Sequence, residues 1–178
     1  MQLDEIKVED LKPLNVAPEK IDAVLKEMRE TPYGGLFPLS SGLSFRHPIQ
    51  KIKNFWRDLK VIRHRAKWSW SYYDCWDLDN WFLKVIPQML DALVDNACGY
   101  KLEIWKDGEN VSIEDPEEYY TFVRELADEF RMANESFYDE IFDYNFAVMP
   151  YKEKEKHMLY HLNRAMNNFA HNFYGFWD

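Results

Sequence analysis

Hydrophobic residues recur every three or four positions along most of this chain, which is the spacing that gathers them on one face of an α-helix. Five such segments begin near Pro18, Pro48, Leu78, Pro116 and Tyr151. Proline suits a first helical turn because the backbone N–H groups there have no partner within the helix. Asp115, which precedes Pro116, can cap its helix, and the acids that follow favour the positive end of the helix dipole.

A shorter segment alternates instead of repeating at helical spacing. Leu102 and Ile104 alternate with polar residues, and so do Val111 and Ile113. Asp107-Gly108 lies between the two pairs and is typical of a tight turn. The pattern predicts a small β-hairpin near residues 100–114 that lies on the helices, because it is too small to be a domain.

These elements predict an all-α fold: a single helical bundle of four or five helices with one small β-hairpin insertion, over residues 46–178. Residues 1–45 are predicted to form an N-terminal arm, a short helix and a linker, since residues 31–42 hold two prolines and three glycines. The helix that begins near Leu78 has a broad apolar face and is expected to be nearly buried. The predicted core residues are Trp81, Val85, Leu90, Phe122, Leu126, Phe130, Leu162 and Phe169.

Composition narrows the class of protein. The chain has 178 residues, 47% of them apolar, and no run of eighteen apolar residues that would indicate a membrane-spanning helix. The first residues are polar and acidic, unlike a signal peptide. The two cysteines, Cys75 and Cys98, are expected to be reduced thiols. We therefore expect a cytoplasmic protein that does not act at a membrane.

Charge is distributed unevenly. The chain carries a net charge of −9, yet Arg46 to Lys67 holds eight Lys/Arg and one acid. Lys101 to Asp143 holds fourteen Asp/Glu and four Lys/Arg. Two interpretations remain open: the basic segment pairs with the acidic helices of the same molecule, or it forms a separate binding face.

The basic segment leads directly into an aromatic one, Trp68 to Trp76, and their junction is the candidate binding site. Cations beside flat rings suit phosphates and bases, or an acidic partner. The competing interpretation places the tryptophans in the core. The candidate binding residues are Lys53, Arg57, Lys60, Arg63, His64, Arg65, Lys67, Trp68 and Trp70.

Two clusters carry residues suited to catalysis or metal binding. Glu153, His157 and His161 lie four residues apart and can share one helix face, as zinc ligands do, although a surface pair of histidines is the simpler interpretation. Three carboxylates, those of Asp74, Asp77 and Asp79, suit acid–base chemistry, but capping a helix explains two of them. With no phosphate-binding glycine loop and no nucleophile motif, the sequence predicts no enzyme, no cofactor and no metal site.

Two motifs stand out between Pro48 and Glu135, Trp76-Asp77-Leu78-Asp79-Asn80-Trp81 and Lys84-Val85-Ile86-Pro87-Gln88-Met89-Leu90, with the turn Gly99-Tyr100 and the tail Phe176-Trp177-Asp178. With these motifs the block resembles a group of small phage-encoded helical proteins. The resemblance implies a phage origin and a role inside the host cell during infection, and it transfers no site residue.

The leading hypothesis is a non-catalytic phage-type accessory protein that binds a host or phage macromolecule, with a counter-defence inhibitor as one example. The expected partner is a host or phage protein. The alternative is a nucleic-acid or nucleotide-binding module that uses residues 53–70.

Overall fold

The computed structural model describes residues 8–30, 48–68, 78–97, 99–142 and 149–176, with side chains at all of these except 10, 48–55, 57 and 58. The structure is mostly helical (74%) with one two-stranded antiparallel hairpin, which confirms the predicted class. Six α-helices lie in the described part, counting the N-terminal one, where the sequence predicted a bundle of four or five. Within the same part, no helix combines the length and apolarity that crossing a membrane requires.

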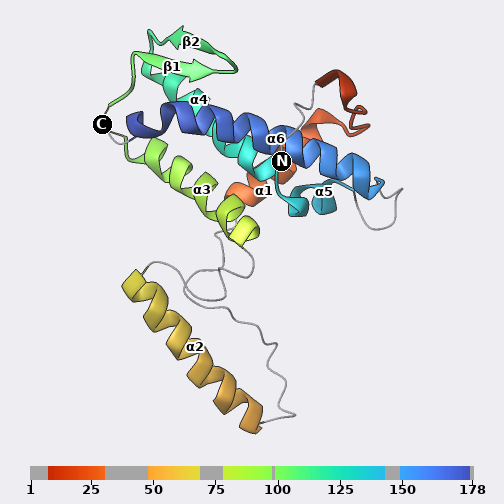
Figure 1. The fold of residues 1–178 in the computed structure, drawn as a ribbon, viewed down its shortest axis with the longest axis vertical. Coiled ribbons are helices and arrows are strands. Elements are labelled where there is room, and N and C mark those ends of the chain that lie inside the picture. The colour runs from red at the N-terminus through yellow and green to blue at the C-terminus, as the bar shows by residue number, and fades with distance from the viewer. Residues whose placement is uncertain (1–7, 31–47, 69–77, 98, 143–148, 177–178) are drawn as a thin grey trace. The chain divides into compact units, whose positions relative to one another are not determined.

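The chain divides into two compact units. The larger comprises Met1–Thr31 and Leu83–Asp178, and the smaller comprises Pro32–Phe82. In chain order the elements are η1 (Val8–Asp10), α1 (Pro18–Glu30), α2 (Pro48–Trp68), α3 (Leu78–Asp95), β1 (Glu103–Lys106), β2 (Glu109–Ser112), α4 (Pro116–Met132), α5 (Glu135–Ile141), α6 (Tyr151–Asn172) and η2 (Phe173–Gly175), as Figure 1 shows. The sequence placed its boundary near residue 45 and grouped α2 with the other helices, whereas the structure assigns α2 to the smaller unit.

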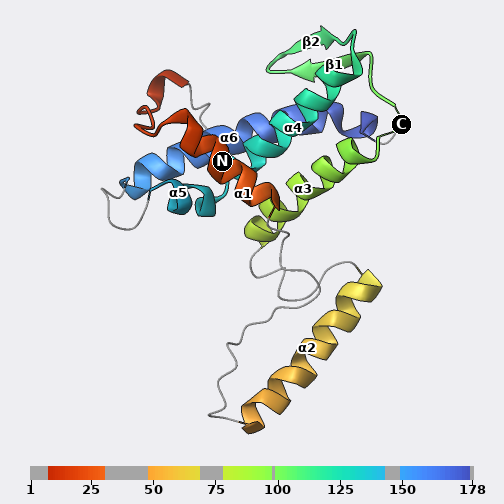
Figure 2. The ribbon, with the colours of Figure 1, turned by 180° about the vertical axis from the view of Figure 1, so that it is seen from behind.

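Helix α1 belongs to the larger unit and is not an appendage. It packs against α5 and α4, and Figure 2 shows it on the side of α4 that faces the viewer. Val24 and Leu25 are buried in one cluster with Phe137, Tyr138 and Ile141. A helical repeat identifies an apolar face without identifying what covers it, so the sequence predicted the helix but not its position.

Helices α4 and α6 form the centre of the larger unit, where they pack side by side (Figure 1). Asp115 caps α4 as predicted, since its side chain accepts a hydrogen bond from the Glu117 N–H (3.0 Å). The helix ends at Met132, and Asn134 begins α5 by accepting from the Ser136 N–H (2.9 Å). This cap explains why the helical pattern after residue 116 is divided into two helices.

Four of the eight predicted core residues are buried, namely Leu90, Phe122, Leu126 and Phe130. The other four, Trp81, Val85, Leu162 and Phe169, are half-buried. The Phe169 ring still stacks on the ring of Phe176 (5.6 Å between centroids) and meets Phe130 edge-on. Phe169 and Phe176 therefore extend the core near the end of α6, whereas Phe173 and Tyr174 are exposed.

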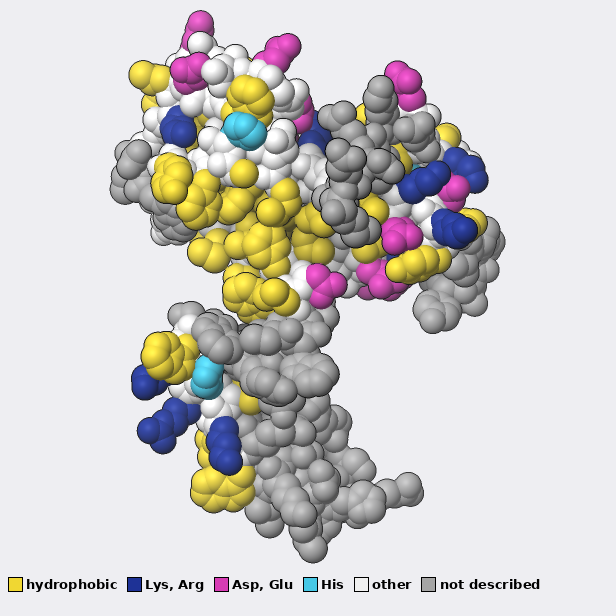
Figure 3. All heavy atoms as spheres, in the orientation of Figure 1, with side chains coloured by type: hydrophobic (Ala, Val, Ile, Leu, Met, Phe, Trp, Pro, Cys, Tyr) yellow, Lys and Arg dark blue, Asp and Glu magenta, His cyan; other side chains and the backbone are white. Residues whose placement is uncertain are grey.

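Helix α3 is less buried than its sequence predicted. Figure 3 shows hydrophobic side chains gathered over it, and Met89 is 48% exposed. Its attachment to α4 is partly ionic, because the buried Arg131 pairs with Asp91 of α3 and with Asp128 of α4 (2.9 Å). A broad apolar face in the sequence of a helix therefore does not show that other elements cover the whole helix.

The hairpin forms where it was predicted. Ile104 pairs with Val111 and Trp105 with Asn110, and the turn residues Asp107 and Gly108 both have positive φ (52° and 102°). Two positive φ values characterise the tight turn that matches the twist of a hairpin, and glycine adopts them without strain. Helix α6 packs against β1, so the hairpin is part of the larger unit.

Candidate functional site

The predicted binding surface lies on α2 and continues past its end. Exposed side chains on α2 include Lys60, Arg63 and Lys67, whereas His64 and Arg65 are half-buried. The backbone of Lys53 and Arg57 belongs to α2, but their side chains lie outside the described part, as does all of Trp70. The structure therefore places six of the nine predicted residues with their side chains, all on one helix of the smaller unit.

Aromatic side chains accompany these cations. Trp56 is 62% exposed and Trp68 is 54% exposed, and the Lys67 ammonium lies 4.7 Å from the centre of the Trp68 ring. Trp68 is one of the candidate binding residues, and its exposure argues against the interpretation that places it in the core. Exposed tryptophan on a charged helix is unusual because burying each ring gains hydrophobic free energy.

The carboxylate cluster near the start of α3 is described only in part. Asp79 lies in the first turn of the helix, where a negative charge favours the helix dipole. Asp74 and Asp77 lie outside the described residues, so the structure tests neither the preferred capping interpretation nor the acid–base alternative for them.

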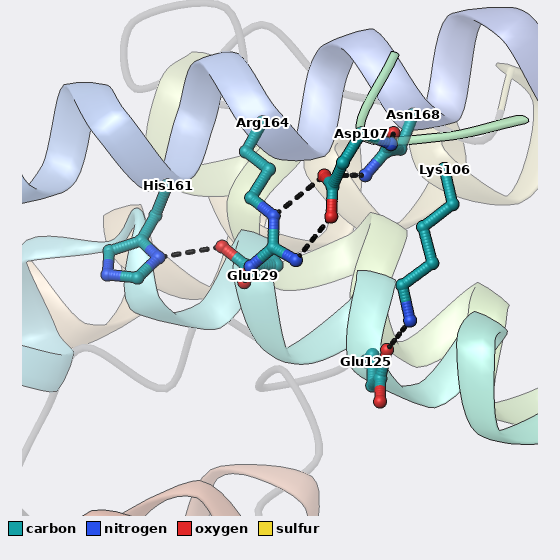
Figure 4. Close-up of polar contacts among 7 residues, drawn as sticks. All are labelled: Lys106, Asp107, Glu125, Glu129, His161, Arg164 and Asn168. Atoms are coloured by element: carbon teal, nitrogen blue, oxygen red, sulfur yellow. Dashed lines mark hydrogen bonds and ion pairs between the residues drawn. The ribbon is translucent and has the colours of Figure 1, made fainter. Parts of the chain in front are cut away.

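A row of polar side chains runs along the inner face of α6, which we call the α6 polar stripe. Its members are His157, His161, Arg164, Asn168 and Asn172. They are spaced by three or four residues, so they fall on one face of the helix. Together they bond the segment at Lys12, the hairpin and α4, and Figure 4 shows the three central ones with their partners.

Arg164 is at the centre of the α6 polar stripe. Its guanidinium donates to both carboxylate oxygens of Asp107 in the hairpin turn (2.8 and 2.7 Å) and to Glu129 of α4 (2.6 Å). The second Glu129 oxygen accepts from His161 Nδ1 (2.7 Å). The hydrogen bonds from Arg164 hold the pKa of the Asp107 carboxyl below its usual value, and the same contacts raise the pKa of Arg164. The group thus fixes the hairpin turn to two helices.

The proposed zinc ligands point to different partners. His157 is 5% exposed and its Nε2 donates to the Lys12 carbonyl (2.8 Å), while His161 bonds Glu129. Glu153 pairs with Lys12 (3.1 Å). No cluster of three metal-ligating side chains occurs in the described ranges. The interpretation as a surface pair was wrong for His157, because its ring is buried under the N-terminal arm.

A cleft of about 410 Å³ opens beside the α6 polar stripe. Its lining residues come from α1, β1, α4 and α6: Ile21, Leu25, Lys106, Phe122, Glu125, Leu126, Asp128, Glu129, Met132, Arg164 and Asn168. The charged groups at its rim already pair with one another, as Lys106 does with Glu125 (2.7 Å). A charged ligand would have to break those pairs, so the cleft offers little binding energy for one.

The sequence contains a pattern that indicates the α6 polar stripe, but it lies in the spacing of polar residues and not in the spacing of apolar ones. His157 and His161 were noted at a spacing of four, but Arg164, Asn168 and Asn172 continue the same face at positions seven, eleven and fifteen after His157. Two asparagines on the inner face of an amphipathic helix predict backbone groups in need of partners.

No protein-family model, no curated protein and no solved structure matches this chain. The resemblance to phage-encoded proteins therefore stays a prediction.

Proposed function

We propose that this chain is a non-catalytic binding protein that contacts a macromolecule through α2. The resemblance supplies the setting of this proposal: a phage-type accessory protein in the host cytoplasm, with a host or phage protein as its partner and counter-defence as one such role. Exposed side chains on α2 support the proposal.

The observation that carries the proposal is the exposure of tryptophan on a cationic helix. Helix α2 holds seven Lys/Arg and one Asp, and both Trp56 and Trp68 are more than half exposed. An aromatic side chain buries about 200 Å² in a core. At about 25 cal/mol per Å², covering the exposed part of each ring would contribute roughly 3 kcal/mol to binding. The cations around the rings favour an acidic partner.

Internal pairing with the acidic helix α4 is the competing explanation for the cations of α2. Three of the five acids of α4 have partners in their own unit: Glu125 pairs with Lys106, Asp128 with Arg29 and Arg131, and Glu129 with Arg164. These three acids are paired without α2. They therefore support a separate role for Lys60, Arg63 and Lys67.

A nucleic acid or nucleotide is the second candidate ligand, and the contact between Lys67 and Trp68 favours it. A ring that is half exposed and has a cation beside it can stack a base while the cation meets the phosphate. Binding of this kind weakens steeply with salt, because each neutralised phosphate releases counterions.

A charge-reversal experiment tests the proposal. One variant carries Lys60→Glu, Arg63→Glu and Lys67→Glu, and the matched control carries Lys26→Glu, Lys152→Glu and Lys156→Glu, which are exposed cations on other helices. Each variant changes the net charge by the same amount. Immobilised proteins are incubated with bacterial lysate, with or without nuclease, and the captured species are quantified.

We expect the wild type and the control variant to capture a common partner that the α2 variant loses at least tenfold. Capture that survives nuclease identifies a protein, and capture that nuclease removes identifies nucleic acid. For a single-stranded oligonucleotide, losing three cations should reduce the slope of log K against log salt by about 2. If the α2 variant captures the same species as the wild type, α2 is not the binding surface.

A further inference from the structure

The β-hairpin has one covered edge and one open edge. Asn172 bonds both backbone groups of Trp105 on β1, accepting from its N–H (3.0 Å) and donating to its C=O (2.7 Å). Asn168 accepts from the Asp107 N–H (2.9 Å). By contrast, all four residues of β2 are exposed, and Figure 1 shows β1 between β2 and the helices. Helix α6 thus covers the edge of β1, and the edge of β2 stays open.

The register establishes which backbone groups of β2 point outward. Residues opposite each other in an antiparallel pair direct their N–H and C=O groups either toward each other or both outward, in alternation. Trp105 directs its groups outward to Asn172, so its partner Asn110 directs its own away from β1. Ile113 bonds inward to Leu102 (2.8 Å), which makes Ser112 the second outward residue. Among the described residues, neither Asn110 nor Ser112 has a hydrogen-bond partner.

Acidic side chains flank this open edge at both ends. Glu109 begins β2, and Glu114, Asp115, Glu117 and Glu118 follow its end, all of them exposed. No Lys or Arg occurs between Asp107 and Val123. Figure 3 shows the acidic side chains standing out over this part of the molecule. The charge therefore selects for a basic partner and against an acidic one.

We propose that the open edge of β2 binds an extended basic peptide, which adds to the hairpin as a third, antiparallel strand. The outward groups of Asn110 and Ser112 provide four main-chain hydrogen bonds. Val111 is 38% exposed and lies on the same face as its buried partner Ile104, so it offers an apolar contact for a β-branched side chain of the peptide. Lys or Arg at the two ends of the peptide meets the flanking acids. This surface and its ligand are independent of α2.

The test uses a capped peptide, Lys-Thr-Val-Thr-Val-Thr-Lys, and amide hydrogen exchange followed by NMR. Four main-chain bonds make a weak site, and we expect a Kd on the order of 0.1 to 1 mM. At saturation the amides of Asn110 and Ser112 should exchange at least fivefold more slowly, whereas that of Val111, already bonded to β1, should not change. No slowing at either amide with several millimolar peptide would overturn the proposal.

Modified peptides test the strand geometry and the charge. N-methylation of the valines and N-methylation of the threonines block opposite edges of the peptide, so one analogue should lose binding and the other should keep it. A peptide with Glu at both ends should bind at least tenfold more weakly. Equal behaviour of the two methylated analogues, or equal affinity of the acidic peptide, would contradict strand addition at this edge.

Variants of the protein complete the test. Ser112→Pro removes an outward N–H without removing a hairpin bond and should weaken binding at least tenfold, whereas Ser112→Ala should retain it. Glu109→Lys with Glu114→Lys should also weaken binding about tenfold, which keeps the test decisive if the proline disturbs the hairpin. Affinity unchanged in this charge variant would refute the proposal. The α2 charge variant should bind the peptide with the affinity of the wild type. A negative result for the β2 edge therefore leaves the proposal for α2 unaffected, and the reverse also holds.

Discussion

Replacing Asn172 with alanine tests whether the α6 polar stripe holds the hairpin in place. The Asn172 side chain is 1% exposed and makes three hydrogen bonds, two with the Trp105 backbone and one with the Asn168 carbonyl (2.8 Å). A buried hydrogen bond contributes about 1 kcal/mol net. Losing all three should therefore lower the free energy of unfolding by about 3 kcal/mol, which corresponds to a Tm lower by roughly 6 to 12 °C in a chain of this size.

The assay combines urea unfolding with hydrogen exchange at the Trp105 amide. In Asn172→Ala that amide loses its acceptor, so its exchange should accelerate more than that of the α5 amides, which lie away from the hairpin. Asn167→Ala is the matched control, because Asn167 is exposed on the same helix, and it should change stability by less than about 0.5 kcal/mol. A loss below about 1 kcal/mol with Trp105 exchange unchanged would show that Asn172 does not anchor β1.

Three further predictions concern the turn, the buried histidine and the attachment of α3. Gly108→Ala should lower the free energy of unfolding, measured in urea, by about 1 kcal/mol, because φ is +102° at this position. The cost comes from the backbone alone, since no atom lies within 4 Å of the added methyl group. The control Glu109→Ala should have little effect. Burial lowers the pKa of His157, so the unfolded chain takes up this proton at a higher pH than the folded chain does, and stability should fall as the pH drops below about 6.5. His157→Gln should flatten this pH dependence in urea unfolding, and His171→Gln should preserve it. Arg131→Ala removes the buried cation that pairs with Asp91 and Asp128, and it should lower the free energy of unfolding by about 3 kcal/mol. Amide hydrogen exchange should increase most in α3, and an equal increase in all helices would contradict this prediction.

The helix starts were predictable because local chemistry sets them. Pro18, Pro48 and Pro116 each begin a helix as expected, since proline in a first turn loses no hydrogen bond. The Asp107-Gly108 turn was equally local, because only certain residues tolerate positive φ at both central positions. These features depend on residues within a few positions of one another.

The parts that were not predicted depend on distant residues. The position of α1 follows from contacts of Val24 and Leu25 with α5, more than a hundred residues later. The burial of His157 follows from the Lys12 carbonyl, 145 residues earlier. On α2, the sequence grouped the cations with Trp68 as one candidate surface, but it did not indicate that Trp56 is exposed on the same helix. Periodicity describes one helix at a time, so it does not specify which helix covers another.

The α6 polar stripe also constrains the order in which the larger unit folds. Its partners precede it by 32 residues at Glu129, 67 at Trp105 and 145 at Lys12, so none of these bonds forms before α6 has been synthesised. Contacts of such long range form slowly because a large loop must close first. A chain that stalls before Tyr151 therefore leaves the edge of β1 uncovered as well as that of β2. A hairpin with two open edges can pair with other chains on both sides, so we expect a chain that lacks α6 to aggregate more readily than one that contains it.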